Sequence, residues 1–264
     1  MRRVGRTVLT ALCILLAALL LFSIWKVFSI LHEYKAAERR YNSLSSDVVM
    51  TSRPSPSPAA AAAVPTAEEP QEEIERSPVS VDFASLAERS GDVVGWLCLP
   101  DTVINYPVVQ GSDNAYYLNR FLDGTPNSGG TLFVDFVCPS DFSGKSTIIY
   151  GHNMRDGSMF ALIDDYIDQA FFDAHPIMYL NTPSQNYKVE FFSGFVSDPE
   201  GFAYQTSFAD EAAFGAFLDK LIASSSVSST VNVSSADRIL LLSTCTYTDL
   251  DVRFILAGKL VPIG

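Results

Sequence analysis

The chain has 264 residues, of which 48% are hydrophobic and 18% charged, a composition typical of a folded protein rather than a disordered one. Its formal net charge is −12. This acidic balance argues against a nucleic acid partner, because phosphate binding needs a basic patch that the sequence does not show.

The first predicted element is an apolar helix near the start of the chain. Three arginines precede an uncharged stretch over residues 7–25, which as a helix would be about 28 Å long, enough to cross a bilayer. A cleaved signal peptide has a similar basic start, but this stretch is long and runs into bulky Phe22, Ile24 and Trp25, which favours an uncleaved anchor. The arginines indicate a cytoplasmic N-terminus, with the rest of the chain outside the cell membrane.

Three further segments follow this anchor, which we place at residues 1–28. Apolar residues at helical spacing over 29–52 predict a juxtamembrane amphipathic helix, which packs on a partner or continues the anchor helix. Residues 53–78 are rich in Pro, Ala and Glu and predict an extended linker. The globular, extracellular domain then occupies residues 79–264, a normal size for one domain.

Short β-type runs separated by turn residues dominate this domain. Helical patterns occur near Phe83 and over residues 113–120 and 210–222. Many short strands without regular βαβ alternation predict a mainly β fold, closed or sandwich-like and antiparallel, and we favour a barrel with inserted helices. The predicted strands cover residues 93–98, 106–109, 131–137, 147–150, 177–180, 187–196, 239–243 and 254–260.

A cysteine and an arginine flank the last loop of the chain. Cys245 ends an apolar run, and Arg253 opens the next predicted strand, across a loop of the length that joins two antiparallel strands. Taken alone, a buried cysteine is usually an inert small hydrophobe, and the arginine could pair with Asp249 or Asp251 in the loop. Placed together, a thiol and a guanidinium are parts of a cysteine acyl-transfer site.

His152 is the candidate base for such a thiol. A free thiol is only a few per cent thiolate at neutral pH, so nucleophilic use needs a nearby base or positive charge. His152 follows a predicted strand, whereas His32 lies just beyond the apolar span and His175 precedes a proline in a predicted turn. The chemistry then assigns attack to Cys245, proton transfer to His152, and oxyanion stabilisation or substrate binding to Arg253.

The other cysteines indicate no further site. Cys13 lies within the apolar span, while Cys98 and Cys138 lie in apolar runs and predict packing or a disulfide. No CxxC, HxxxH or comparable ligand spacing is present, so the sequence predicts neither a metal site nor a cofactor.

Four segments resemble the sortases, in particular class B: INYPVVQGSDNAYYL, STIIYGHNMRDGSMF, DAHPIMYLNTPSQNYKVEFFS and LLLSTCTYTDLDVRFILAGKL. The resemblance implies an eight-stranded sortase β-barrel with an N-terminal helix and an inserted helix before the catalytic cysteine strand, preceded by one transmembrane helix. It also implies that the family's catalytic cysteine, histidine and arginine are Cys245, His152 and Arg253.

The resemblance further implies a substrate groove. Five positions resemble class B groove residues: Asn114, Leu118, Tyr204, Ser243 and Thr246. For Leu118 a plain packing role is the alternative. The chain departs from the best-known class B pattern at Gln205 and Thr246, which bears on the preferred sorting motif.

The function implied is that of a membrane-anchored cysteine transpeptidase of a Gram-positive-type bacterium. Its partners would be surface proteins with a C-terminal sorting motif, cleaved after Thr, and an amine of the peptidoglycan precursor (lipid II type). The alternatives are a pilin-polymerising sortase that uses a pilin lysine, a non-catalytic surface-binding module with the same barrel, and a cysteine peptidase that releases its product to water.

Overall fold

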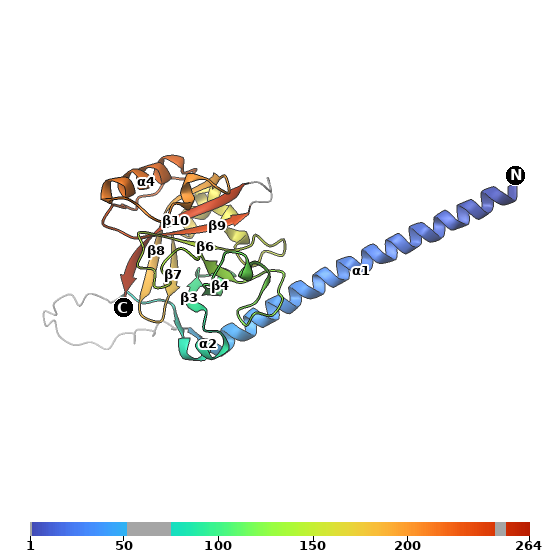
Figure 1. The fold of residues 1–264 in the computed structure, drawn as a ribbon, viewed down its shortest axis with the longest axis horizontal. Coiled ribbons are helices and arrows are strands. Elements are labelled where there is room, and N and C mark those ends of the chain that lie inside the picture. The colour runs from blue at the N-terminus through green and yellow to red at the C-terminus, as the bar shows by residue number, and fades with distance from the viewer. Residues whose placement is uncertain (1, 52–74, 246–251) are drawn as a thin grey trace, which may run out of the picture.

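Eight strands close into a barrel in the order β10-β8-β7-β3-β4-β5-β6-β9 (Figure 1). The structure is a computed structural model that describes residues 2–51, 75–245 and 252–264. Each strand lies at or within a few residues of a predicted run, so the predicted barrel is confirmed. The strands are β3 (Val93–Cys98), β4 (Asn105–Val109), β5 (Leu132–Val134), β6 (Ser146–Tyr150), β7 (Ile177–Asn181), β8 (Asn186–Ser197), β9 (Ile239–Cys245) and β10 (Arg253–Ile263).

The barrel is mixed rather than wholly antiparallel, which corrects the predicted architecture. Strand β4 pairs with β5 in parallel, and β6 pairs with β9 in parallel, while the other pairings are antiparallel. A parallel pair needs a long crossover connection, and the connections β4–β5 and β6–β9 both have the length for one. The β6–β9 pair matters for function because both strands end at the same edge of the barrel.

Strand β9 is buried on both faces, which explains its continuous apolar run. Leu240 and Leu242 belong to the main core, whereas Ile239 and Leu241 belong to a second core beneath α4 (Glu211–Ser224). Helix α4, the predicted inserted helix, begins at Asp210, whose carboxylate accepts the Ala213 N–H at 2.8 Å as an N-cap. A strand with both faces covered loses the usual alternation of polar and apolar residues.

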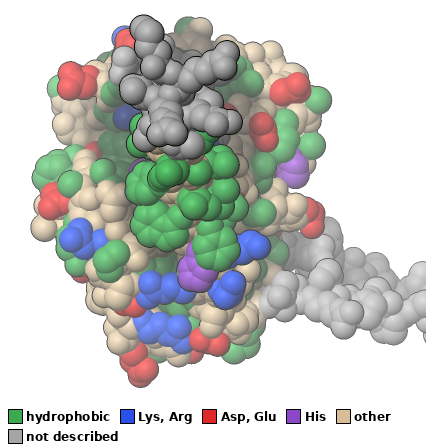
Figure 2. All heavy atoms as spheres, turned by 90° about the vertical axis from the view of Figure 1, so that its right-hand side faces the viewer, with side chains coloured by type: hydrophobic (Ala, Val, Ile, Leu, Met, Phe, Trp, Pro, Cys, Tyr) green, Lys and Arg blue, Asp and Glu red, His purple; other side chains and the backbone are tan. Residues whose placement is uncertain are grey.

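A single helix, α1 (Arg2–Val48), continues from the apolar segment through the predicted juxtamembrane helix (Figure 1). Among the described residues it is the one helix long and apolar enough to cross a membrane. The side chains between Leu12 and Leu31 are mostly exposed, and in Figure 2, where the helix points toward the viewer, hydrophobic side chains fill the centre of the view. Its last turns pack on the barrel through Tyr41, Leu44 and Val48, which are buried.

The strands that flank the Pro-rich segment lie side by side. Strand β1 (Val49–Thr51) pairs antiparallel with β2 (Val79–Val81), and Thr51 is the partner of Val79. Residues 52–74, which include most of the predicted linker, lie outside the described residues. The two ends of the Pro-rich segment therefore lie next to each other, at the end of helix α1 that packs on the barrel.

The small helices differ most from the prediction. Helix α2 (Phe83–Arg89) is confirmed, with Asp82 as its N-cap. The helix predicted over residues 113–120 is reduced to a 3-10 helix, η1 (Tyr116–Asn119), because the Asp113 carboxylate accepts the N–H groups of Ala115 and Tyr116 in a turn. The sequence interpretation missed the elements η2 (Ala161–Ile167), α3 (Gln169–Ala174) and η3 (Phe202–Tyr204).

Because several tyrosines are buried, we expect the protein to lose stability at alkaline pH. Burial raises the pKa of Tyr166, whose hydroxyl donates to the His175 carbonyl at 2.8 Å. A tyrosine in the unfolded chain titrates near pH 10, so its stabilising contribution is present below about pH 10 and is lost as the pH rises further. We expect the free energy of unfolding to fall above pH 10 by up to about 1.4 kcal/mol per pH unit for each such tyrosine.

Urea unfolding at pH 8, 10 and 11 measures this loss. Tyr166→Phe has no titrating hydroxyl and should show a shallower decline than the parent chain, although it is less stable at pH 8. Equal declines in the two proteins would contradict the assignment to Tyr166.

Candidate active site

Three neighbouring strands bring the predicted catalytic residues to one edge of the barrel. In the antiparallel β9–β10 hairpin, Cys245 is the register partner of Arg253. In the parallel β6–β9 pair, Tyr150 is opposite Ser243, and the Gly151 N–H donates to the Ser243 carbonyl at 3.1 Å. His152 and Cys245 each lie two residues beyond that pair, on strands that are spaced by about 4.8 Å.

Backbone contacts fix the place of His152. Its Nε2 lies 2.7 Å from the carbonyl oxygen of Leu118, and its own carbonyl accepts the Phe160 N–H at 2.9 Å. Because a carbonyl oxygen can only accept, Nε2 carries the hydrogen of this bond, and Nδ1 is the ring nitrogen not used in it.

Gly151 is needed immediately before the histidine. A Cβ at this position would lie 2.5 Å from the Phe160 ring and 2.6 Å from the Leu132 side chain. Glycine therefore lets the backbone run close to these two core side chains at the end of β6, just before His152.

A cavity of about 270 Å³ lies at this edge. Four of the five predicted groove residues line it together with His152 and Arg253; these are Asn114, Leu118, Tyr204 and Ser243. The fifth, Thr246, lies outside the described residues, and of Cys245 the structure describes the backbone. The segments that carry the lining residues are far apart in sequence, so the barrel assembles the cavity.

Leu118 has two roles in this cavity. Its side chain is partly buried against the core and lines the cavity, while its carbonyl oxygen receives the His152 bond. Asn114 lies before η1, and its side-chain oxygen accepts the Phe136 N–H at 3.0 Å.

A tyrosine pair forms another wall of the cavity, and one member was missed in the sequence. Tyr150 stacks on Tyr204 with ring centroids 6.2 Å apart and an interplanar angle of 9°, and the Tyr204 hydroxyl lies 2.9 Å from the Ser243 hydroxyl. Tyr150 donates to an Asp135 carboxylate oxygen at 2.8 Å, and burial together with this carboxylate raises the Tyr150 pKa, so the phenol stays protonated. The sequence could have pointed to Tyr150, because this residue directly precedes Gly151 and the predicted base His152.

The two other cysteines of residues 79–264 are poor nucleophiles. Cys98 and Cys138 are buried free thiols, so the predicted packing role is confirmed and the alternative disulfide is absent from this described pair. Burial raises the pKa of Cys98 to about 11 and raises that of Cys138. Both stay protonated at neutral pH, and a protonated thiol does not attack a carbonyl group efficiently.

No group of three His, Cys, Asp or Glu side chains among the described residues is arranged to hold a metal ion.

The chain is similar to curated and structurally characterised proteins of one kind. It is 39% identical over 182 residues to "Sortase B" of Listeria monocytogenes, a match that covers 68% of this chain and 74% of the relative. No family model matches the chain.

Solved structures agree with this relationship. The structure of a Staphylococcus aureus sortase B–substrate complex is 33% identical, with a TM-score of 0.66, and the match covers 69% of this chain and 85% of that one. A sortase B complexed with triglycine is also 33% identical, with a TM-score of 0.66, over 69% and 86% of the two chains. The chain therefore belongs to the class B sortases, a family of cysteine transpeptidases.

Proposed function

We propose that this sortase cleaves a C-terminal sorting motif after its threonine, holds the protein as a thioester on Cys245, and transfers it to an amine of the peptidoglycan precursor. The observation that carries the proposal is the strand register, in which Cys245 is opposite Arg253 and His152 follows the parallel neighbour of the same strand.

The first half of the reaction is acyl transfer to the cysteine. The Cys245 thiolate attacks the threonine carbonyl carbon, and Arg253 stabilises the oxyanion or holds the substrate. The carbon–nitrogen bond then breaks as the imidazolium of His152 gives its proton to the departing amine.

The second half reverses these steps with a new amine. The incoming amine attacks the thioester carbon, His152 accepts its proton, and the carbon–sulfur bond breaks to restore the thiolate. The relatives bear on both halves, since one solved sortase B is in complex with a substrate and another with triglycine, a peptide that carries an amine.

The apolar half of α1 gives the proposed location. With that half in the bilayer and the N-terminal arginines in the cytoplasm, the barrel lies outside the cell. Both the sorting-motif protein and a lipid-linked amine then reach the enzyme at the membrane.

Mass spectrometry of the whole chain in lipid nanodiscs tests this function. The protein is incubated with a library of threonine-containing sorting peptides and with triglycine, a lysine peptide or no acceptor. We expect an acyl adduct that maps to Cys245, which triglycine converts to an exchange product. Cys98→Ala should behave like the parent, and Cys245→Ala should form no adduct.

The other outcomes separate the alternatives. Exchange onto the lysine peptide alone would favour pilin polymerisation, and hydrolysis alone at saturating amine would favour a peptidase. With no adduct for any peptide the transpeptidase proposal fails, and the barrel would serve as a binding module.

A further inference from the structure

Helix α1 ends in a buried contact with the catalytic domain, and Tyr41 is at its centre. The Tyr41 ring packs against Phe121 and Tyr106, with centroids 4.9 and 5.1 Å apart. Its hydroxyl donates to the Gly130 carbonyl and lies 3.2 Å from the Thr131 hydroxyl. Burial raises the Tyr41 pKa, so the hydroxyl remains a donor at physiological pH.

One set of contacts leads from the Tyr41 hydroxyl to the ring of His152. Gly130 has a φ of 59°, and a Cβ there would lie 2.5 Å from the carbonyl oxygens of Tyr117 and Leu118. The next residue, Thr131, donates its N–H to the Tyr117 carbonyl at 3.0 Å. The loop that Tyr41 holds is therefore in backbone contact with the segment whose Leu118 carbonyl binds His152 Nε2.

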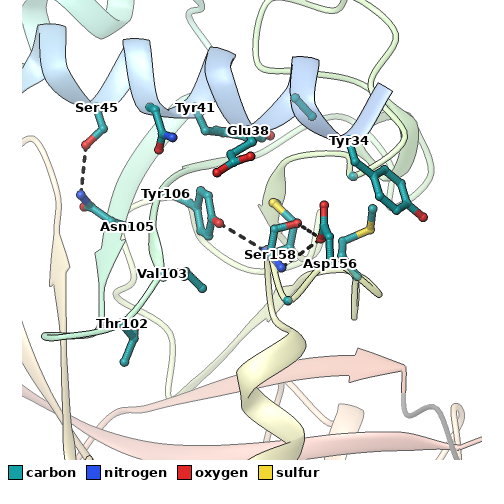
Figure 3. Close-up of a pocket in the computed structure, with 16 residues that line it drawn as sticks. Tyr34, Glu38, Tyr41, Ser45, Thr102, Val103, Asn105, Tyr106, Asp156 and Ser158 are labelled. Carbon is teal, nitrogen blue, oxygen red and sulfur yellow. Dashed lines mark hydrogen bonds between the residues drawn. The ribbon is translucent and has the colours of Figure 1, made fainter. Parts of the chain in front are cut away.

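A second set leads from the Tyr41 ring to the backbone of His152. Tyr41 packs on Tyr106, whose hydroxyl accepts the Met159 N–H at 3.3 Å. Met159 forms a β-bridge with Asn153, and the following residue, Phe160, donates its N–H to the His152 carbonyl. Figure 3 shows α1 above this loop, with Tyr106 pointing toward the Ser158 region.

The surroundings of Tyr41 combine other contacts with a cavity, and the neighbouring Arg40 forms an ion pair with Asp123 at 2.9 Å. A cavity of about 340 Å³ lies between α1 and the loop after His152, with Glu38 on one side and Asp156 on the other (Figure 3). Among the residues that line it, the Asn105 side chain donates to the Ser45 hydroxyl at 3.0 Å. The Gly130 carbonyl also accepts from the Asn127 side-chain amide at 3.1 Å, and Leu44 and Val48 of α1 are buried as well, so Tyr41 shares the support of this loop with other residues.

We propose that Tyr41 is a positioning residue for His152, which it orients from the anchor helix through the Leu118 carbonyl and through Tyr106. Tyr41 touches neither the substrate cavity nor the reacting atoms. The proposal rests on the proposed role of His152, and it makes the end of the anchor helix part of the support of the active site.

Tyr41→Phe tests this in the whole chain in nanodiscs, because it removes the hydroxyl and keeps the ring. We expect kcat for peptide-to-triglycine exchange to fall by about 10-fold, since small misplacements of a catalytic group are costly, while KM for the sorting peptide stays within about 2-fold. We also expect the midpoint of the histidine limb of the pH–rate profile to move, because the bond to the Leu118 carbonyl is altered.

Arg89→Gln is the matched control. Arg89 forms an ion pair with Asp47 of α1 at 2.8 Å, at the same interface but outside both sets of contacts. We expect it to leave the pH–rate profile unchanged, whatever its effect on the melting temperature. Tyr41→Ala, which also removes the ring, should lower kcat further than Tyr41→Phe.

Two results would overturn the proposal. One is a Tyr41→Phe protein with the parent's kcat and pH–rate profile; the other is an Arg89→Gln protein with the same shift of profile, which would indicate general loosening of the interface. In both cases the parent chain would still form the Cys245 adduct, so the failure is distinct from a failure of the proposed function.

Discussion

His152→Gln is expected to lower kcat/KM for exchange by about 10²- to 10⁴-fold, the range found for loss of a general acid–base group. Glutamine can keep a donor near the Leu118 carbonyl, 2.7 Å from Nε2 in the parent, but it cannot exchange a proton. Both halves of the reaction should therefore slow, and the pH–rate profile should lose its histidine limb. Stopped reactions followed by chromatography of the peptide products give the rates.

His175→Gln is the matched control for this substitution. His175 follows α3 and its ring packs on Phe171, with centroids 4.6 Å apart, outside the active-site cavity. We expect its kcat/KM to stay within about 2-fold of the parent value, by the usual small effect of substitutions away from the chemistry. A His152→Gln protein that retained most of the parent activity would remove His152 from the mechanism.

Arg253→Lys is expected to lower kcat/KM by about 10²- to 10³-fold, the usual cost of removing one oxyanion donor. Arg253 opens β10 opposite Cys245 and lines the cavity, and its Nη1 donates to the Val252 carbonyl at 3.2 Å. Lysine keeps the charge but lacks the planar fork of donors, so charge alone should not restore the rate. Single-turnover release of the leaving peptide measures the step in which the oxyanion forms.

Arg238→Lys separates this effect from a general loss of arginine. The Arg238 guanidinium donates to the Phe142 carbonyl at 3.1 Å and lies 5.3 Å from the Tyr187 ring centroid, outside the cavity. This variant should lose stability rather than single-turnover rate. If Arg253→Lys released the peptide as fast as the parent, the oxyanion role would be wrong, and binding alone would remain for Arg253.

The strands could be predicted because their signal is local. The apolar run that ends at Cys245 and the hairpin to Arg253 need neighbouring residues alone, and both predictions are confirmed by β9 and β10. Strand β5 was predicted too long. The Asp135 N–H still donates to the Ile148 carbonyl, but the Asp135 carbonyl accepts the Cys138 N–H, so the chain enters a turn there. Apolar residues continue past that turn, and exposed Phe136 and Val137 imitate a strand.

The parallel pairings and the support of the site could not be predicted in this way. The pairing of Tyr150 with Ser243 joins residues far apart in sequence, and no local pattern distinguishes parallel from antiparallel neighbours. The Leu118 carbonyl that binds His152 is a backbone atom, which the identity of the side chain does not reveal. In the sequence, Tyr41 is one more apolar position on an amphipathic helix. The partners of its hydroxyl, Gly130 and Thr131, are about 90 residues away and come close only in the folded chain.

Because β1 pairs with β2, the height of the barrel above the bilayer does not depend on the length of the Pro-rich segment. Because Thr51 and Val79 are register partners, the number of residues between them does not set how far the barrel stands from the bilayer. With the apolar half of α1 in the membrane, as proposed, the helix from Lys26 to Tyr41, its first buried contact with the barrel, sets that height at about 23 Å. Removal of one residue from its exposed part would lower the barrel by about 1.5 Å and turn it by about 100° around the helix axis. The number of residues in the exposed part of α1 thus sets the direction in which the cavity opens relative to the membrane. The length of the Pro-rich segment does not affect this direction.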